Sequence, residues 1–214
     1  MVKQTQLALS DAAEWLGDWH PLAEQLGSAD GLTALGSVAL HLRLRPVEDI
    51  PSLRQFLRRY HSRLLVPFEL PAIQAAHGHA ERNELRELVA LDQQLAREAV
   101  LQTFAPASRR VGQGQLRKLR PLRDQRIVQR YLQSVETGEA HGWHTLVYGL
   151  SLAIYSLPLR QGLLGYGQQA TRSFIYSAAR TLRLSERICR ELFEERCMDL
   201  PAAIESLLCR PMMG

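Results

Sequence analysis

Apolar residues recur at helical spacing along most of this 214-residue chain. Spacings of three and four residues place side chains on one face of an α-helix. The first clear case follows an Asp49-Ile50-Pro51-Ser52 start and comprises Leu53, Phe56, Leu57 and Tyr60. No stretch alternates apolar and polar residues convincingly, as a strand would, and good helix formers such as Leu, Ala, Arg, Glu and Gln dominate. The pattern predicts an all-α protein.

Prolines and glycines divide the pattern into about eight to ten helices, as in a multi-helix bundle. Pro67 is expected to end the first helix, and a short helix to about His79 follows. The longest helix is expected from Glu84 to about Phe104. The later helices are expected near residues 106–119, 127–135, 144–157, 160–181, 188–198 and 201–208.

These elements are expected to form a single all-α domain over residues 46–214. Residues 1–45 are punctuated by glycines and read as a poorly defined segment that packs on the bundle or extends it. Residues 145–159 contain no charged side chain, but Gly149, Ser151 and Pro158 dilute the run. A membrane-spanning helix needs about 20 apolar residues. We therefore expect a buried core helix here, with an apolar binding face as the alternative, and no membrane partner.

Basic residues concentrate in residues 105–130, where seven arginines and Lys118 stand against the single acid Asp124. The net charge of the whole chain is only +4. Contacts to nucleic-acid phosphates are one use of such a run, but no recognisable module is present and no stacking aromatic interleaves before Tyr131. A solvated or protein-contacting arginine face is favoured over nucleic acid. This outer face is expected to comprise Arg109, Arg110, Arg117 and Lys118.

The sequence Gly112-Gln113-Gly114 lies within this basic run and raises the question of a phosphate cradle. No G-x-x-x-x-G-K-[ST] motif is present, and no strand precedes the glycines. A small residue on a helix more often permits close approach of a neighbouring helix. We expect Gly112 to be such a packing point, with Leu116 and Leu119 in the core.

Cysteines and histidines do not form a recognisable metal or catalytic motif. The three cysteines are an odd number without a C-x-x-C pair, which argues against a disulfide framework or structural zinc and favours a reducing cytoplasm. His77 and His79 are two residues apart and point different ways on a helix. His141 and His144 are three apart and could share a face, but structural or solvent-exposed roles are favoured for both pairs over a transient metal contact, and no metal site is expected. Without a nucleophile–base motif, the chain reads as a binding or scaffolding protein.

Three segments, in order, resemble the UreF family of urease accessory proteins. Residues 69–99 resemble the family's acid-Leu-Pro pattern and the Leu-Asp helix after it. The stretch APASRRVGQGQLRKL at 105–119 resembles an Arg-rich family helix, and its Ser108 and Gly112 fall on the family's Ser and Gly. Residues 144–186 are similar to a His-x-x-Val-x-Gly helix and the elements that follow it. The matching residues there are His144, Val147, Gly149, Tyr166, Ala178, Ala179 and Arg180.

The resemblance implies a non-catalytic, dimeric, cytoplasmic all-α scaffold. Its implied partners are a UreD-like protein (also called UreH), a UreG-like GTPase and apo-urease. It implies no stably bound cofactor, nickel only in transit, and an effect on GTP hydrolysis only through the partner. The family's N-terminal Pro-x-Gly-x-aromatic-x-His-Ser-x-Gly pattern is reduced here to small residues and a loose leucine pattern. A diverged helical interaction protein serving another partner or metal system is therefore the alternative.

Two of the matching residues are polar or charged within apolar surroundings. For His144, at the start of the uncharged helix, we expect a cap or core role, with a polar passage or an interface as the alternative. Arg180 follows two alanines on an apolar helix, where an unpaired charge is costly to bury. We expect it to pair with an internal carboxylate or main-chain carbonyls, or else to line a subunit-facing surface.

Overall fold

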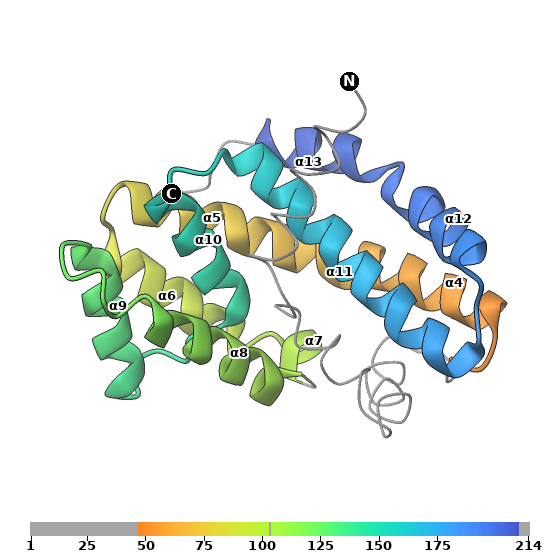
Figure 1. The fold of residues 1–214 in the computed structure, drawn as a ribbon. Helices are drawn as coiled ribbons and strands as arrows, with labels where there is room; N and C mark the ends of the chain where they lie inside the picture. The colour runs from red at the N-terminus through yellow and green to blue at the C-terminus, as the bar shows by residue number, and fades with distance from the viewer. Residues whose placement is uncertain (1–46, 103, 210–214) are drawn as a thin grey trace.

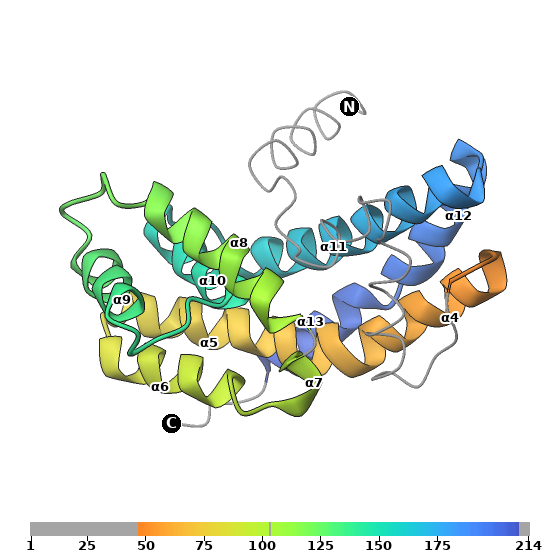
Figure 2. The same ribbon diagram turned by 90° about the horizontal axis from the view of Figure 1, so that it is seen from below.

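A long helical segment, residues 50–81, crosses the molecule from one end to the other (Figure 1, Figure 2). The structure is a computed structural model that describes residues 47–102 and 104–209, apart from the side chain of Arg180. Every regular element in this part of the chain is helical, which confirms the predicted all-α class. The predicted segment 1–45 lies outside the described residues, so the division of the chain at residue 46 stays a prediction.

The helices are arranged around this long segment. In chain order they are α4 (Ile50–Tyr60), the π-helical stretch η1 (His61–Glu69), α5 (Leu70–Glu81), α6 (Leu85–Leu95), α7 (Ala99–Gln102), α8 (Ala105–Lys118), α9 (Arg126–Glu136), α10 (His144–Ile154), α11 (Leu159–Leu182), α12 (Glu186–Cys197) and α13 (Leu200–Leu208). At one end α10 packs on α5 and α8, while α6 packs on α5 and α9. At the other end α11 packs on α4, α12 and α13.

Local sequence signals account for three of the helix starts. Asp49 forms a capping box with Ser52, whose backbone N–H donates to the Asp49 carboxylate at 2.8 Å. The Ser185 hydroxyl accepts from the backbone N–H of Ile188 at the start of α12. Pro106 lies in the first turn of α8, where its missing N–H has no intrahelical partner to lose. These local interactions are independent of the rest of the fold.

The prediction that Pro67 ends the first helix is wrong. The chain stays helical through Pro67 because residues 61–69 adopt π-helical pairing, in which Leu70 N–H donates to the Leu65 carbonyl five residues back. A proline in an α-helix clashes with the carbonyl four residues before it, whereas the wider π turn moves that carbonyl away. Glu69, the last residue of η1, is buried.

The prediction of a single longest helix from Glu84 to Phe104 is also wrong. The chain turns after Leu95, and α7 is a separate short helix. The side-chain amide of Gln102 donates to the Ala96 carbonyl at 2.6 Å and so satisfies an acceptor that a continuing helix would have used. This turn allows both Leu101 and Phe104 to reach the core. The longest described helix is α11.

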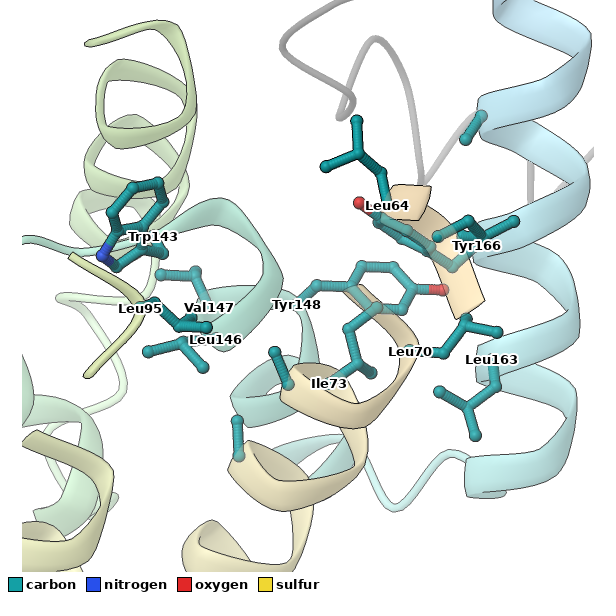
Figure 3. Close-up of a cluster of buried hydrophobic side chains, with 14 of the residues drawn as sticks. Leu64, Leu70, Ile73, Leu95, Trp143, Leu146, Val147, Tyr148, Leu163 and Tyr166 are labelled. Atoms are coloured by element: carbon teal, nitrogen blue, oxygen red, sulfur yellow. The ribbon is translucent and has the colours of Figure 1, made fainter. Parts of the chain in front are cut away.

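The uncharged run begins as a core helix, as predicted, but α10 ends at Ile154 rather than at residue 157, and residues 155–158 are exposed. Residues 144–150 of α10 are all buried, and Tyr148 extends between α5 and α11, beside Leu70, Ile73, Leu163 and Tyr166 (Figure 3). The Tyr148 hydroxyl donates to the Gly162 carbonyl at 3.0 Å. Among the described residues, no helix has both the length and the apolar character needed to span a bilayer.

Candidate functional site

Three residues that match the family motifs meet in the interior. Ser108 from α8 and Tyr166 from α11 bind opposite nitrogens of His144, the first residue of α10. The Ser108 hydroxyl lies 2.7 Å from His144 Nδ1, and the Tyr166 hydroxyl lies 2.6 Å from His144 Nε2. All three side chains are at most 3% exposed. The structure therefore confirms a core role for His144 and joins it to residues 36 and 22 positions away in sequence.

The hydrogen-bonded chain continues into the long helical segment. Tyr166 also hydrogen-bonds the carboxyl group of Glu69, which accepts from the Tyr60 hydroxyl at 2.6 Å. Burial raises the pKa of both phenols well above the ordinary value, and the neighbouring Glu69 carboxylate raises it further. Both phenols are therefore protonated donors. We call the residues Tyr60, Glu69, Ser108, His144 and Tyr166 the buried polar chain.

One arrangement of protons accounts for these contacts. If Tyr60 and Tyr166 donate to Glu69, the Tyr166 oxygen accepts from a protonated His144 Nε2. His144 Nδ1 is then an acceptor for the Ser108 hydroxyl, and the Ser108 oxygen accepts the backbone N–H of His144 at 3.4 Å. In this arrangement the imidazole links the buried Glu69 carboxyl group to α8. The arrangement connects five helical elements, α4, η1, α8, α10 and α11, and fixes the orientation of each side chain.

The Ser108–His144 contact has the geometry of a nucleophile and its base, but its setting is that of a core. Ser108 is fully buried, and the adjacent cavity between Glu69, Phe104, Trp143 and His144 has room for only about one water molecule (≈ 10 Å³). A substrate cannot reach the serine without separation of α8 from α10. The described geometry therefore supports an architectural role for this pair.

Asp92 of α6 is a second buried anchor, and the sequence reasoning missed it as a site residue. Its carboxylate accepts from the Tyr131 hydroxyl at 2.7 Å and from the backbone N–H groups of His141 and Gly142 at 2.6 and 2.8 Å. The Asp92 carbonyl accepts from Trp143 Nε1 at 3.2 Å. A signal was present in the sequence, because Asp92 interrupts the apolar stripe of α6.

Gly112 lies against the loop that Asp92 holds. A Cβ atom built on Gly112 would come within 2.2 Å of the Gly142 carbonyl oxygen and 2.7 Å of His144 N. The prediction that Gly112 is a close-packing point is confirmed. Gly149 has the same role between α10 and α5, where a Cβ atom would lie 2.4 Å from the Ile73 carbonyl oxygen. These contacts let helix backbones approach closely and position His144 between them.

The basic residues of α8 divide into two groups. The first group is exposed, as predicted, and comprises Arg110, Arg117 and Lys118. The core positions between and after them are buried, also as predicted, and are Leu116 and Leu119. Arg109 was predicted on the outer face, and this is wrong. It is half-buried with its guanidinium 5.1 Å from the centroid of the Trp143 ring, and its Nε has no hydrogen-bond partner among the described residues. The flat guanidinium and the indole face attract each other, which draws Arg109 inward.

The remaining candidates are not gathered at one site. His141 is half-buried, and its main chain binds Asp92 and Gln113, while both ring nitrogens of His144 are already hydrogen-bonded. Within residues 47–102 and 104–209, no group of three or more His, Cys, Asp or Glu side chains is placed to hold a metal ion. Transient nickel contact at His141 or His144 stays the less favoured alternative. The predicted pairing of Arg180 concerns a side chain that lies outside the described part of the structure.

Replacing His144 with phenylalanine should lower the free energy of unfolding by about 2 kcal/mol. The ring volume is kept, but Ser108 and Tyr166 each lose a partner in a buried setting. Urea unfolding followed by circular dichroism measures the change. His141→Phe, on the half-buried neighbour, should change the free energy of unfolding by less than about 0.5 kcal/mol. If His144→Phe lowers the free energy of unfolding no more than His141→Phe does, the architectural role of His144 is contradicted.

A separate histidine lies at the other end of the molecule. His61 Nε2 is 2.7 Å from the Thr171 hydroxyl, which itself donates to the Gly167 carbonyl. Burial, with a smaller contribution from the positive charge of Arg196, lowers the pKa of His61 to about 4. Cys197 also hydrogen-bonds Thr171, and burial raises the pKa of its thiol to about 11. Both groups are therefore neutral near pH 7.

The low pKa of His61 makes stability depend on pH in a defined direction. In the unfolded chain His61 binds a proton below its ordinary pKa of 6.5, but in the folded chain only below about 4. The free energy of unfolding should therefore fall as the pH drops from about 6.5 to about 4, by up to about 3 kcal/mol, and level off below. In His61→Gln this part of the pH dependence should disappear from urea unfolding curves. If the free energy of unfolding depends on pH equally in the wild type and in His61→Gln, His61 is not the group responsible.

Comparison with known proteins gives one family. The UreF family model matches residues 47–190, about two thirds of the chain. The matched range contains the whole buried polar chain, Asp92, Gly112 and Gly149. No individually curated protein matches the chain.

Proposed function

Because the chain belongs to the UreF family of urease accessory proteins, we propose that it is a non-catalytic scaffold in urease maturation. In this role it binds a UreD/UreH-like protein and a UreG-like GTPase and supports the delivery of nickel to apo-urease. The family match over residues 47–190 carries the proposal. The protein acts in the cytoplasm, as a homodimer, and meets nickel as cargo rather than as a resident cofactor.

The positions of the motif residues support a scaffold over an enzyme. Ser108, Gly112, His144, Gly149 and Tyr166 are buried or half-buried at contacts between α5, α8, α10 and α11. Such residues specify how the helices pack and leave the outer helix faces for partners. A scaffold needs a rigid arrangement of surfaces, and the buried polar chain together with the close glycine contacts provides one.

The proposal is tested by deleting the gene in a urease-positive host and measuring urease protein, urease activity and nickel per urease. Urease protein should remain at its usual level, while nickel content and activity fall and return when the chain is supplied in trans. Normal nickel loading in the deletion strain would refute the proposal and favour a diverged UreF-fold protein with another client.

A further inference from the structure

The start of α9 carries three exposed arginines. Arg126 and Arg130 are one helical turn apart, and Arg123 precedes the helix by three residues. We call these residues the α9 arginine strip. The opposite, apolar face of α9 packs on α6 and α8, so the strip faces away from the helices that hold α9 in place. In both views α9 lies at the end of the molecule opposite α12 (Figure 1, Figure 2).

The strip places cations where an isolated helix disfavours them. The N-terminal end of a helix carries a partial positive charge and favours acidic residues, yet the first turn of α9 contains Arg126, no acid, and no side-chain cap. Like charges four residues apart on a helix also repel each other, as Arg126 and Arg130 must. Neither the helix dipole nor charge pairing along the helix explains this arrangement.

Among the described residues, no carboxylate forms an ion pair with the strip. Arg54, Arg120 and Arg160, on other exposed surfaces, each lie within ion-pair distance of a glutamate. None of the three strip arginines has such a carboxylate in the described part of the chain. Asp124, the acid between Arg123 and Arg126 in the sequence, accepts a hydrogen bond from the Gln125 side chain at 3.4 Å. The positive potential of the strip is therefore directed to the solvent.

We propose that the α9 arginine strip docks an acidic surface of a protein partner. A guanidinium presents a planar set of donors that matches a carboxylate in bidentate fashion. Single-stranded nucleic acid would also need aromatic side chains for base stacking, but Tyr131, the aromatic residue of α9, is fully buried. The proposal rests on α9 alone and does not depend on urease as the client.

Poly-L-glutamate provides a probe of defined chemistry. The fluorescently labelled polymer is titrated with the full-length chain at low and at high salt, with anisotropy as the readout. The variant Arg126→Glu/Arg130→Glu should bind at least tenfold more weakly than the wild type at low salt. Added salt should weaken wild-type binding and reduce the difference in affinity between the wild type and the variant. The matched control, Arg86→Glu/Arg97→Glu, makes the same change in net charge at two exposed arginines of the α6 region and should change binding less than twofold.

A thermal melt shows whether a variant that binds more weakly is still folded. An acid at position 126 agrees with the helix dipole, so the single variant Arg126→Glu should weaken binding while its Tm is unchanged or raised. Three results would overturn the proposal. The first is that the wild type does not bind poly-L-glutamate at low salt. The second is that the strip variant and the control variant lose the same amount of affinity for the polymer. The third is that a DNA oligonucleotide of equal charge binds more tightly than poly-L-glutamate and that this binding depends on the strip.

Discussion

Replacing Asp92 with alanine should lower the free energy of unfolding by about 4 kcal/mol. The change removes the acceptor of the Tyr131 hydroxyl and of the backbone N–H groups of His141 and Gly142. A buried donor left without a partner costs about 1–3 kcal/mol, and these three lose theirs together. Urea unfolding followed by circular dichroism measures the total. Hydrogen exchange should show the loss locally, as faster exchange of the His141 and Gly142 amides.

The control for this change lies on the same helix. Glu87 is exposed in the first turn of α6, and Glu87→Ala should cost less than about 1 kcal/mol and leave exchange of the loop amides unchanged. If Asp92→Ala is no more destabilising than Glu87→Ala, Asp92 does not anchor the loop before α10.

Replacing Gly112 with alanine should destabilise the protein by about 3 kcal/mol, while the same change at Gly114 should stabilise it by up to about 1 kcal/mol. The new methyl group at 112 would overlap the main chain of residues 142–144, which cannot move aside as a flexible side chain does. At Gly114, nothing lies within 4 Å of the position of a Cβ atom. There the substitution simply replaces glycine with a better helix former.

The two variants form a matched pair, since both glycines lie in α8 and receive the same methyl group. Their thermal or urea unfolding curves should differ by about 4 kcal/mol. Equal effects of the two changes would mean that α8 does not approach the 142–144 backbone as described. Because Asp92 and Gly112 hold the same loop from two sides, Asp92→Ala and Gly112→Ala together should cost less than the sum of the single changes.

Helical periodicity predicted most of the helices correctly because each amphipathic segment carries its own signal. The failures have particular causes. Pro67 was read by the rule for α-helices, and the π-helical pairing of residues 61–69 removes the clash on which that rule depends. The turn after Leu95 depends on the Gln102 side chain reaching the Ala96 carbonyl, an interaction that an apolar pattern does not record.

The sequence identified only part of the site. Ser108, His144 and Tyr166 were selected through the family resemblance, but nothing in their spacing indicated that they bind one another. Glu69 and Asp92 were not selected as site residues. Asp92 interrupts the apolar stripe of α6, but the donors that make it an anchor come from α9 and from the loop before α10. Arg109 was misplaced because its contact with Trp143 joins residues 34 positions apart.

The sequence by itself determined the all-α class, most helix boundaries, the buried helix α10, the packing role of Gly112 and the resemblance to the UreF family. These follow from interactions within a few residues along the chain, or from a linear pattern that the family shares. Only the tertiary structure decided which polar residues meet in the core and which arginines turn inward. It also showed that the arginine strip of α9 lacks an ion-pair partner among the described residues. Those outcomes depend on contacts between distant segments, whose energies are set by burial and geometry rather than by residue order.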